Sequence, residues 1–510
     1  MNLRKNVWEL GDDWADSILW YARAVADMQT RPLADPTSWR FYGAMHGIDA
    51  PLWQLQGYLA PGESLPATGV SATFWSQCQH GTWYFLPWHR GYLLMFEANV
   101  RATVVKLGGP ADWALPYWNY FKTGQSALPP AFAAQQTPDG TPNALYVAQR
   151  FGPNNDGNVY VDLSQVTLNA LGEGDFTGPG NGGSPGFGGV DTGFEHGGNT
   201  HGYLESQPHD MVHVLVGGQE PSGRHLPGLM SDPDTAGLDP IFWLHHANID
   251  RLWEVWLQQS AARTDPSDAN WSDGPAKIGE RPFVMPQPDA STWTYTPAGM
   301  TNLSQLGYTY DDFTPAGAPA PAIAPGPPPA PAALSGTGGG NGGAEVEPGK
   351  NVELVGASQG RLSILGSDVA TSVKLDPATR QKVTATFAAA VPEAERDRVF
   401  LNLENVKGLS DATRFNVYIG VPQSADPSDH PERLAGSVAL FGVRKASKPD
   451  GDHAGAGLNF VLDITRIASN LHLEGDLEKD AVDVRIVPAR PVTEAAHVSV
   501  GRISLYRQGR

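Results

Sequence analysis

The stretch that decides the fold is Asp239-Pro240-Ile241-Phe242-Trp243-Leu244-His245-His246-Ala247-Asn248-Ile249-Asp250-Arg251-Leu252-Trp253. It predicts a helix whose N-cap is Asp239 and whose first residue is Pro240, because proline has no N–H to leave unpaired there. His246 and Asp250 are four residues apart and therefore share a face of this helix. A histidine in such apolar surroundings is costly unless its ring nitrogens find partners, and a metal ion is one natural partner.

Five further histidines add to this signal. His209 and His213 are also four residues apart, which on a helix suits two ligands of one metal ion, although a pair of structural histidines would look the same. His46, His80 and His89 lie upstream. Two sets of three histidines, with no cysteine or carboxylate obviously completing either, predict two imidazole-only metal sites. Imidazole suits copper or zinc, so ligand type alone leaves the metal open.

The segments around these histidines resemble the binuclear copper family of tyrosinases, catechol oxidases and molluscan-type haemocyanins. The resemblance covers most of residues 40–313, and it is carried by Leu86-Pro87-Trp88-His89-Arg90, Leu115-Pro116-Tyr117-Trp118-Asn119-Tyr120 and 239–253. It implies a mainly α catalytic domain, a four-helix bundle that holds two copper ions with dioxygen bound between them as peroxide. By this resemblance, copper A is bound by His46, His80 and His89, and copper B by His209, His213 and His246.

The remaining histidines of this region and the cysteine receive other roles. The family pattern makes His246 the ligand and leaves His245 as a supporting or packing residue; His196, His201 and His225 are expected to be loop histidines. Cys78, the only cysteine, excludes an intramolecular disulfide. Cys78-Gln79-His80 resembles the Cys-x-His arrangement of fungal tyrosinases, which implies a thioether between Cys78 and His80. The alternative is an inert buried thiol.

Two acidic residues are the catalytic candidates. Glu205 resembles the plant-type glutamate which, together with the asparagine after the first copper B histidine, holds a water that accepts the phenol proton. In this chain that asparagine is replaced by Asp210. A carboxylate accepts hydrogen bonds whereas an amide also donates them, so the exchange leaves open whether Asp210 preserves, replaces or abolishes the water site. The alternative is that Asp210 is a solvated helix residue with no part in catalysis. Val214 and Met230 are expected to line the substrate entrance.

Composition excludes several classes of partner. The formal net charge is −19 and the isoelectric point about 5.1, and an acidic surface repels nucleic acid and anionic membranes. No apolar run approaches the ~20 residues that span a bilayer. The first eight residues lack the apolar core of a secretion signal, so we expect a cytoplasmic protein, with export alongside a partner left open.

The periodicity of the chain changes at a segment rich in proline, alanine and glycine. Residues 314–346 predict a linker between a catalytic domain, 1–313, and a C-terminal domain, 347–510. Helical spacing over 14–29, 91–105 and 240–257 precedes it. Alternating runs such as Arg414–Ile419 and Val482–Val487 follow it and indicate an all-β sandwich. Residues 413–419 resemble the plant C-terminal domain, which implies a domain that covers the copper site and keeps the enzyme latent; a stabilising or oligomerisation domain is the alternative.

The resemblance therefore implies a copper-dependent phenol oxidase that converts monophenols, o-diphenols or both to o-quinones while dioxygen is reduced to water. An o-aminophenol oxidase and a haemocyanin-like oxygen carrier share the ligand pattern, although a single copper module argues against a carrier. Of these alternatives, a zinc hydrolase is the one that the surrounding motifs support least. The expected partners are a phenolic small molecule and dioxygen, with a homo-oligomer and a copper chaperone left open.

Overall fold

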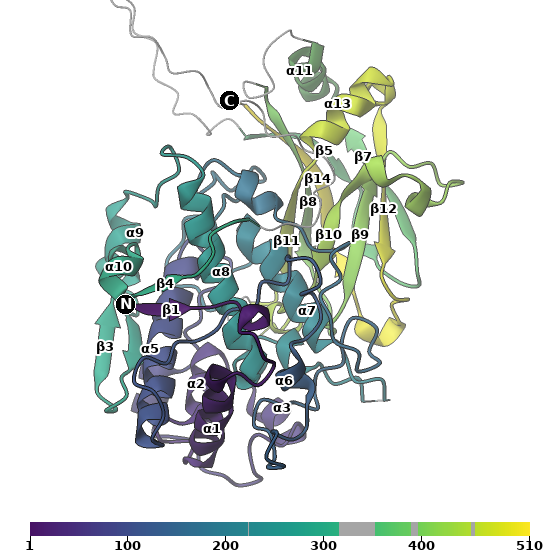
Figure 1. Cartoon of the computed structure of the whole chain (residues 1–510). Coiled ribbons are helices and arrows are strands. Elements are labelled where there is room, and N and C mark those ends of the chain that lie inside the picture. The colour runs from purple at the N-terminus through teal and green to yellow at the C-terminus, as the bar shows by residue number, and fades with distance from the viewer. Residues whose placement is uncertain (223, 316–351, 389–395, 450–453, 510) are drawn as a thin grey trace, which may run out of the picture.

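The computed structural model describes residues 1–222, 224–315, 352–388, 396–449 and 454–509. A helical region precedes residue 315 and a β-rich region follows residue 352, which confirms the predicted multidomain fold class (Figure 1). From residue 316 onward the predicted linker lies outside the described residues, so the boundaries 1–313, 314–346 and 347–510 stay predictions. None of the described helices is both long enough and apolar enough to cross a membrane.

Four helices form the framework of the catalytic domain: α1 (Asp16–Thr30), α2 (Trp39–His46), α5 (Phe85–Lys106) and α8 (Pro240–Gln258). A π-helical turn, Glu205–Asp210, continues into α7 (Met211–Gly217). The remaining short helices are α3 (Ala50–Leu55), α4 (Thr68–Phe74), α6 (Pro130–Ala133), α9 (Ala269–Asp273) and α10 (Leu303–Leu306). The periodicity in the sequence therefore predicts α1 and α8 to within two residues at each end, whereas the predicted start of α5 is six residues late and omits the turns that carry His89.

Helix α8 begins as its sequence predicts. The Asp239 side chain accepts a hydrogen bond from the Ile241 N–H at 3.0 Å, and Pro240 occupies the first turn. The helix packs against α5, where the rings of Phe96 and Trp243 stack at an interplanar angle of 6°. Because apolar residues surround α8, its histidines lie in the interior of the domain.

The two ends of the catalytic domain meet in a small parallel sheet. Strand β1 (Asn2–Arg4) pairs with β4 (Tyr308–Tyr310), and a hairpin of β2 (Phe283–Pro286) and β3 (Thr292–Tyr295) lies nearby. The hydroxyl groups of Tyr308 and Tyr310 both donate to Asp250 on α8. The tyrosine motif thus joins the end of the catalytic domain to its central helix.

The C-terminal domain is an antiparallel sheet in the order β10-β9-β12-β7-β5-β14-β8-β11. The strands are β5 (Val352–Ser358), β7 (Val369–Leu375), β8 (Arg398–Val406), β9 (Arg414–Ile419), β10 (Leu434–Ala439), β11 (Leu458–Asp463), β12 (Ala481–Pro488) and β14 (Arg502–Gln508). A Cβ on Gly436 in β10 would lie 3.1 Å from Leu462 in β11, so the sheet curves until its two edges face each other. It encloses its own apolar core, and α11 (Pro377–Ala388) and α13 (Thr465–Leu473) lie at its far end (Figure 1).

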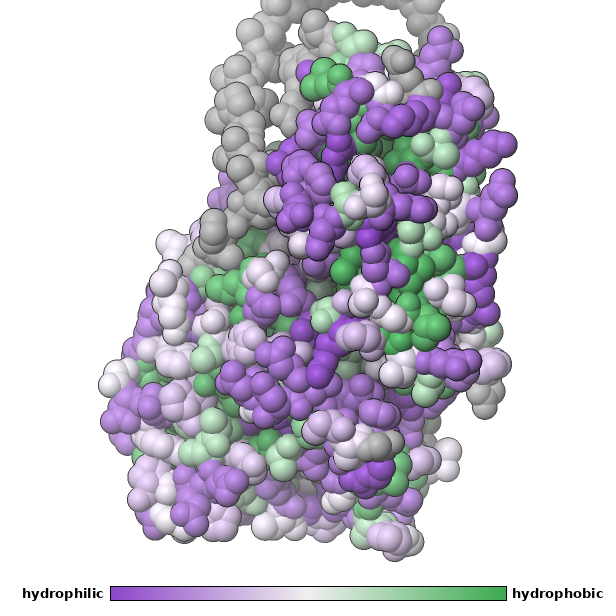
Figure 2. Space-filling model, turned by 90° about the vertical axis from the view of Figure 1, so that its right-hand side faces the viewer, coloured by the Kyte–Doolittle hydropathy of each residue, from purple (hydrophilic) through white to green (hydrophobic). Residues whose placement is uncertain are grey.

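The two domains lie directly against each other. Helix α7 faces strands β10 and β11 (Figure 1), and Ala439 and Phe441 from the C-terminal domain belong to the core of the catalytic domain. On the face shown in Figure 2, both domains present mainly polar side chains with apolar side chains in separate groups, as on ordinary globular surfaces. The C-terminal domain therefore covers the side of the catalytic domain on which α7 lies.

Candidate metal centre

Six histidines from six different segments of the catalytic domain converge in its interior. His46 ends α2, His80 lies in the segment between α4 and α5, and His89 is in the first turns of α5. The other three are His209 on the π-helical turn, His213 on α7 and His246 on α8. All six are at most 4% exposed.

The rings form two adjoining groups. The centroids of His46, His80 and His89 are 5.1 to 5.7 Å apart. Those of His209, His213 and His246 are 4.4 to 5.5 Å apart. The rings of His89 and His246 stack at 4.5 Å and bring the two groups together. The structure thus brings all six predicted histidines together, and because His89 is closer to His246 than to His46 or His80, their division into two sets of three stays a prediction.

The hydrogen bonds of these rings fit metal binding. The Nδ1 atoms of His46, His89 and His213 donate to the backbone carbonyls of Pro233, Phe85 and Met230 at 2.7 to 2.8 Å. His209 Nδ1 donates to the Asp210 carboxylate at 2.9 Å. Such a bond selects the tautomer whose Nε2 carries the lone pair that a metal ion needs.

The opposite nitrogens face the centre. Within the described residues, the buried Nε2 atoms of His46, His80, His89 and His209 have no hydrogen-bond partner. Those of His213 and His246 lie 3.3 Å from each other. Burial lowers the pKa of His46 to about 4, and burial together with the neighbouring imidazoles also lowers the pKa of the other five. The rings are therefore neutral, which is the form that binds metal ions.

His245 is close to the second group as well. Its ring centroid is 5.0 Å from that of His213, and its Nδ1 lies 3.4 Å from the Tyr120 hydroxyl. Its ligand atom lies within 4.8 Å of those of the second group, so position alone does not separate His245 from His246. The assignment of His246 as the ligand stays a prediction.

The catalytic candidates form a buried cluster with His201. Both oxygens of Glu205 accept from the Gly81 N–H at 3.0 Å, and burial raises the pKa of Glu205 to about 8. Asp210 accepts from His209 through one oxygen and from His201 Nδ1, at 2.7 Å, through the other. Burial alone would lower the pKa of His201, but the charges of Glu205 and Asp210 raise it to about 9. Asp210 is thus a buried partner of two imidazoles, so the solvated helix residue considered as an alternative is wrong.

Cys78 lies beside the first group of histidines. Its sulfur is near the ligand atoms of His46 and His80 and 3.2 Å from His196 Nδ1. The thioether with His80 stays a prediction.

His196 itself lies in a loop, where its Nε2 is 2.6 Å from the Lys445 ammonium of the C-terminal domain, and His225 is exposed.

One residue at the centre was missed by the sequence reasoning. Phe441, in the loop between β10 and α12 (Val443–Ala446), lies with its ring on that of His213, 4.3 Å between centroids and 24° between planes. Its ring also lies 5.8 Å from His209 and 6.1 Å from His80. Gly442 turns the chain directly after it with a φ of 82°. Nothing in Leu440-Phe441-Gly442 marks this phenylalanine, because its contacts arise only when the two domains dock.

The two entrance candidates are buried beside His213. Val214 and Met230 are both 0% exposed, and the Met230 carbonyl is the acceptor for His213 Nδ1. Their role at a substrate entrance stays a prediction.

Comparison with known families matches both parts of the chain. A family model described as the common central domain of tyrosinase matches residues 36–185 and 181–259. A second, described as a domain of unknown function (DUF7868), matches residues 351–508. The catalytic and C-terminal regions therefore match separate families.

Similar proteins extend over the whole chain. Tyrosinase HcTyr1 of Hahella sp. (strain CCB-MM4) is 35% identical over 526 residues, which cover 100% of both chains. A chloroplastic polyphenol oxidase of Malus domestica is 26% identical over 80% of this chain and 64% of its own length. Among solved structures, latent apple tyrosinase superposes with a TM-score of 0.58 at 21% identity, covering 99% of this chain and 97% of its own. Latent aurone synthase superposes with a TM-score of 0.59 at 19% identity, covering 100% and 90%.

Proposed function

Because this chain belongs to the tyrosinase family and is a copper oxidoreductase with a binuclear centre, we propose that it oxidises phenols and catechols to o-quinones and reduces dioxygen to water. The observation that carries the proposal is the convergence of six buried, neutral histidines whose Nε2 atoms face one another. We assign His46, His80 and His89 to one copper ion and His209, His213 and His246 to the other. Two bound copper ions supply one electron transfer each, which suits the two-electron oxidation of a catechol.

The residues around the centre orient the ligands and exclude water. Backbone carbonyls and Asp210 hold four of the imidazoles by Nδ1, so their rings are oriented before the metal binds. Phe85 and Phe242 pack against His89 and His246, with 4.6 and 4.2 Å between ring centroids. The face of His213 offers a flat surface on which an aromatic substrate can stack.

We propose that the protein is latent while its C-terminal domain is docked. Phe441 occupies the face of His213 and is 2% exposed, so a phenol cannot stack there in this conformation. Displacement of the domain removes the ring and opens the site. This assigns the blocking side chain that the sequence does not reveal.

One observation favours a second candidate, catechol oxidation without monophenol hydroxylation. Hydroxylation needs a base for a phenol whose pKa is near 10. Both oxygens of Asp210 are engaged by imidazole N–H groups, and both oxygens of Glu205 by the Gly81 N–H. This arrangement supports oxidation of a catechol more directly than deprotonation of a monophenol.

The test is oxygen uptake by copper-loaded protein, intact and cut between residues 316 and 346, with a monophenol and the matching catechol. We expect the cut protein to turn over faster, and unchanged turnover after confirmed removal of the C-terminal domain contradicts latency. Uptake with both substrates supports tyrosinase chemistry, and uptake with the catechol alone supports the second candidate. Uptake with neither, in protein that binds two copper ions, contradicts the proposal and favours an o-aminophenol oxidase or an oxygen carrier.

Four further expectations remain proposals that this experiment does not address. They are the Cys78–His80 thioether, a cytoplasmic location, homo-oligomerisation and loading by a copper chaperone.

A further inference from the structure

Two side chains of one short segment enter the catalytic domain together. The ring of Phe441 lies on His213, and the Lys445 ammonium lies 2.9 Å from Asp234 Oδ1 and 2.6 Å from His196 Nε2. Both side chains line the same small cavity beside the metal centre. In the closed form, an aromatic ring and an ammonium group from one segment therefore occupy the same cavity beside the metal centre.

Asp234 lies beside the metal centre. It ends the segment whose backbone carbonyls orient two histidines, since Met230 accepts from His213 and Pro233 accepts from His46. Its side chain is 7% exposed and forms an ion pair with Lys445. The Asp234 carboxylate is thus within hydrogen-bond distance of an ammonium group that lines the cavity beside the centre.

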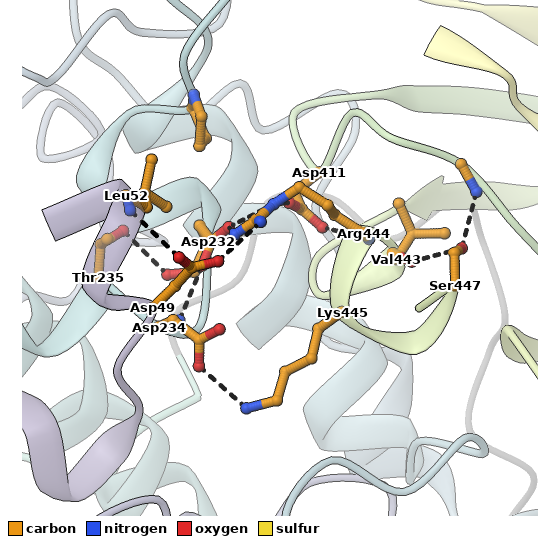
Figure 3. A network of polar contacts seen from close by, with 12 residues as sticks. Asp49, Leu52, Asp232, Asp234, Thr235, Asp411, Val443, Arg444, Lys445 and Ser447 are labelled. Atoms are coloured by element: carbon orange, nitrogen blue, oxygen red, sulfur yellow. Dashed lines mark hydrogen bonds and ion pairs between the residues drawn. The ribbon is translucent and has the colours of Figure 1, made fainter. Parts of the chain in front are cut away.

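The neighbouring ion pairs, like Lys445–Asp234, join a carboxylate of the catalytic domain to a cation of the C-terminal domain. Figure 3 shows Arg444 between Asp49 and Asp232 of the catalytic domain, with Asp411 on its other side, and Lys445 directed at Asp234. Across this interface the catalytic domain contributes the carboxylates and the C-terminal domain the cations.

The whole catalytic domain is strongly acidic. Residues 1–313 contain 15 Lys or Arg and 32 Asp or Glu, a net charge of −17, whereas residues 347–510 contain 20 and 21, a net charge of −1. Displacement of the C-terminal domain therefore leaves three carboxylates at the opened site without these cations. Such a field attracts cationic ligands and repels anionic ones.

We propose that the opened site selects phenols and catechols that carry an alkylammonium group over those that carry a carboxylate. The ring stacks on His213 and the ammonium pairs with Asp234, the two contacts that Phe441 and Lys445 make in the closed form. The inference rests on the proposed function and names its substrate class.

The first test compares two catechols on the copper-loaded full chain: 2-(3,4-dihydroxyphenyl)ethylamine and 3-(3,4-dihydroxyphenyl)propionate. The ratio of their kcat/KM values cancels the fraction of open molecules, because the same open state oxidises both. We expect the amine to be favoured at least about tenfold, in the range of a charge-assisted hydrogen bond. Phe441→Ala should raise both rates and keep the ratio.

Two variants test whether Asp234 is the carboxylate that causes the preference for the amine. Asp234→Asn should bring the ratio close to one, whereas Asp139→Asn, which removes a charge from an exposed turn, should leave it unchanged. Equal kcat/KM values in the wild-type chain, or a ratio that survives Asp234→Asn, contradict the inference and leave the proposed function intact.

The second test needs no catalysis. In the copper-free full chain carrying Phe441→Ala and Lys445→Ala, we expect calorimetry to show that 2-phenylethylamine binds at least about tenfold more tightly than 3-phenylpropionate. Adding Asp234→Asn should remove the difference. Equal affinities, or no binding of the amine, overturn the inference. If no phenol or catechol is oxidised, the proposed function is wrong, and the calorimetry still decides the inference.

Discussion

At the scale of the residue, four histidines of the centre use their two nitrogens differently. His46, His89 and His213 donate Nδ1–H to a backbone carbonyl and His209 donates to a carboxylate, while Nε2 faces the interior. A buried nitrogen without a partner is costly, and a metal ion removes that cost. The unsatisfied Nε2 atoms are therefore the atomic evidence for the centre.

The adjacent pair on α8 allows a direct test of the ligand assignment. We expect His246→Gln to lower the copper content from two ions per chain to about one, because the second group then keeps two imidazoles. His245→Gln is the matched control and should keep both ions. Copper content is measured by atomic absorption on dialysed protein. The reverse result would make His245 the ligand.

At the scale of the element, α8 connects the metal centre to the outer frame of the domain. One turn after His246, Asp250 accepts from Arg4 on β1 and from Arg90 on α5. The two tyrosines of β4 donate to the same carboxylate. Burial raises the pKa of Asp250, but the two guanidinium groups lower it more, so the carboxylate stays charged. Four elements are thus joined at one buried side chain.

Removal of this charge should destabilise the catalytic domain. Asp250→Asn leaves the buried Arg4 and Arg90 without their shared carboxylate, so we expect the free energy of unfolding to fall by about 3–5 kcal/mol. Glu63→Gln, which breaks a more exposed pair with Arg40, should cost less than about 1 kcal/mol. Urea unfolding followed by tryptophan fluorescence measures both. A similar decrease in the free energy of unfolding for the two variants would contradict the role of Asp250 as the shared partner of Arg4 and Arg90.

At the scale of the whole molecule, ion pairs join the C-terminal domain to the catalytic domain beside the metal centre. Arg444 pairs with Asp49 and Asp232, and Arg398 at the start of β8 pairs with Glu173 at 2.9 Å. Phe441 is placed on His213 by this docking. The ion pairs that dock the C-terminal domain therefore lie several residues away from Phe441, and they couple the domain to the metal centre.

Weakening this docking should activate the intact chain. We expect Arg444→Gln to raise its oxygen uptake with a catechol at least about tenfold, because the buried Asp232 and Asp411 and the partly buried Asp49 then lose their shared cation. Added salt should act in the same direction, since it screens the ion pairs. The control Arg502→Gln breaks an exposed pair within the C-terminal domain and should have no effect. Chain cut in the linker and freed of the domain no longer contains Arg444 and should not respond to salt, and a response there would contradict docking as the cause.

Much of the fold and part of the site could be predicted because their signals are local. Spacing of apolar residues predicts α1, α5 and α8, the cap at Asp239 predicts where α8 begins, and alternation predicts the β-rich region. The curvature of the sheet and the links made by Asp250 could not be predicted, because they depend on how distant segments pack.

The sequence by itself determined the family, the copper cofactor and the order of a helical before a β-rich region, because motifs and periodicity are properties of neighbouring residues. Only the tertiary structure decided which side chains meet across long separations. It placed Phe441 on His213 and Lys445 on Asp234. The physical reason is that such contacts form only when separately folded elements dock, and nothing in the local sequence encodes the partner.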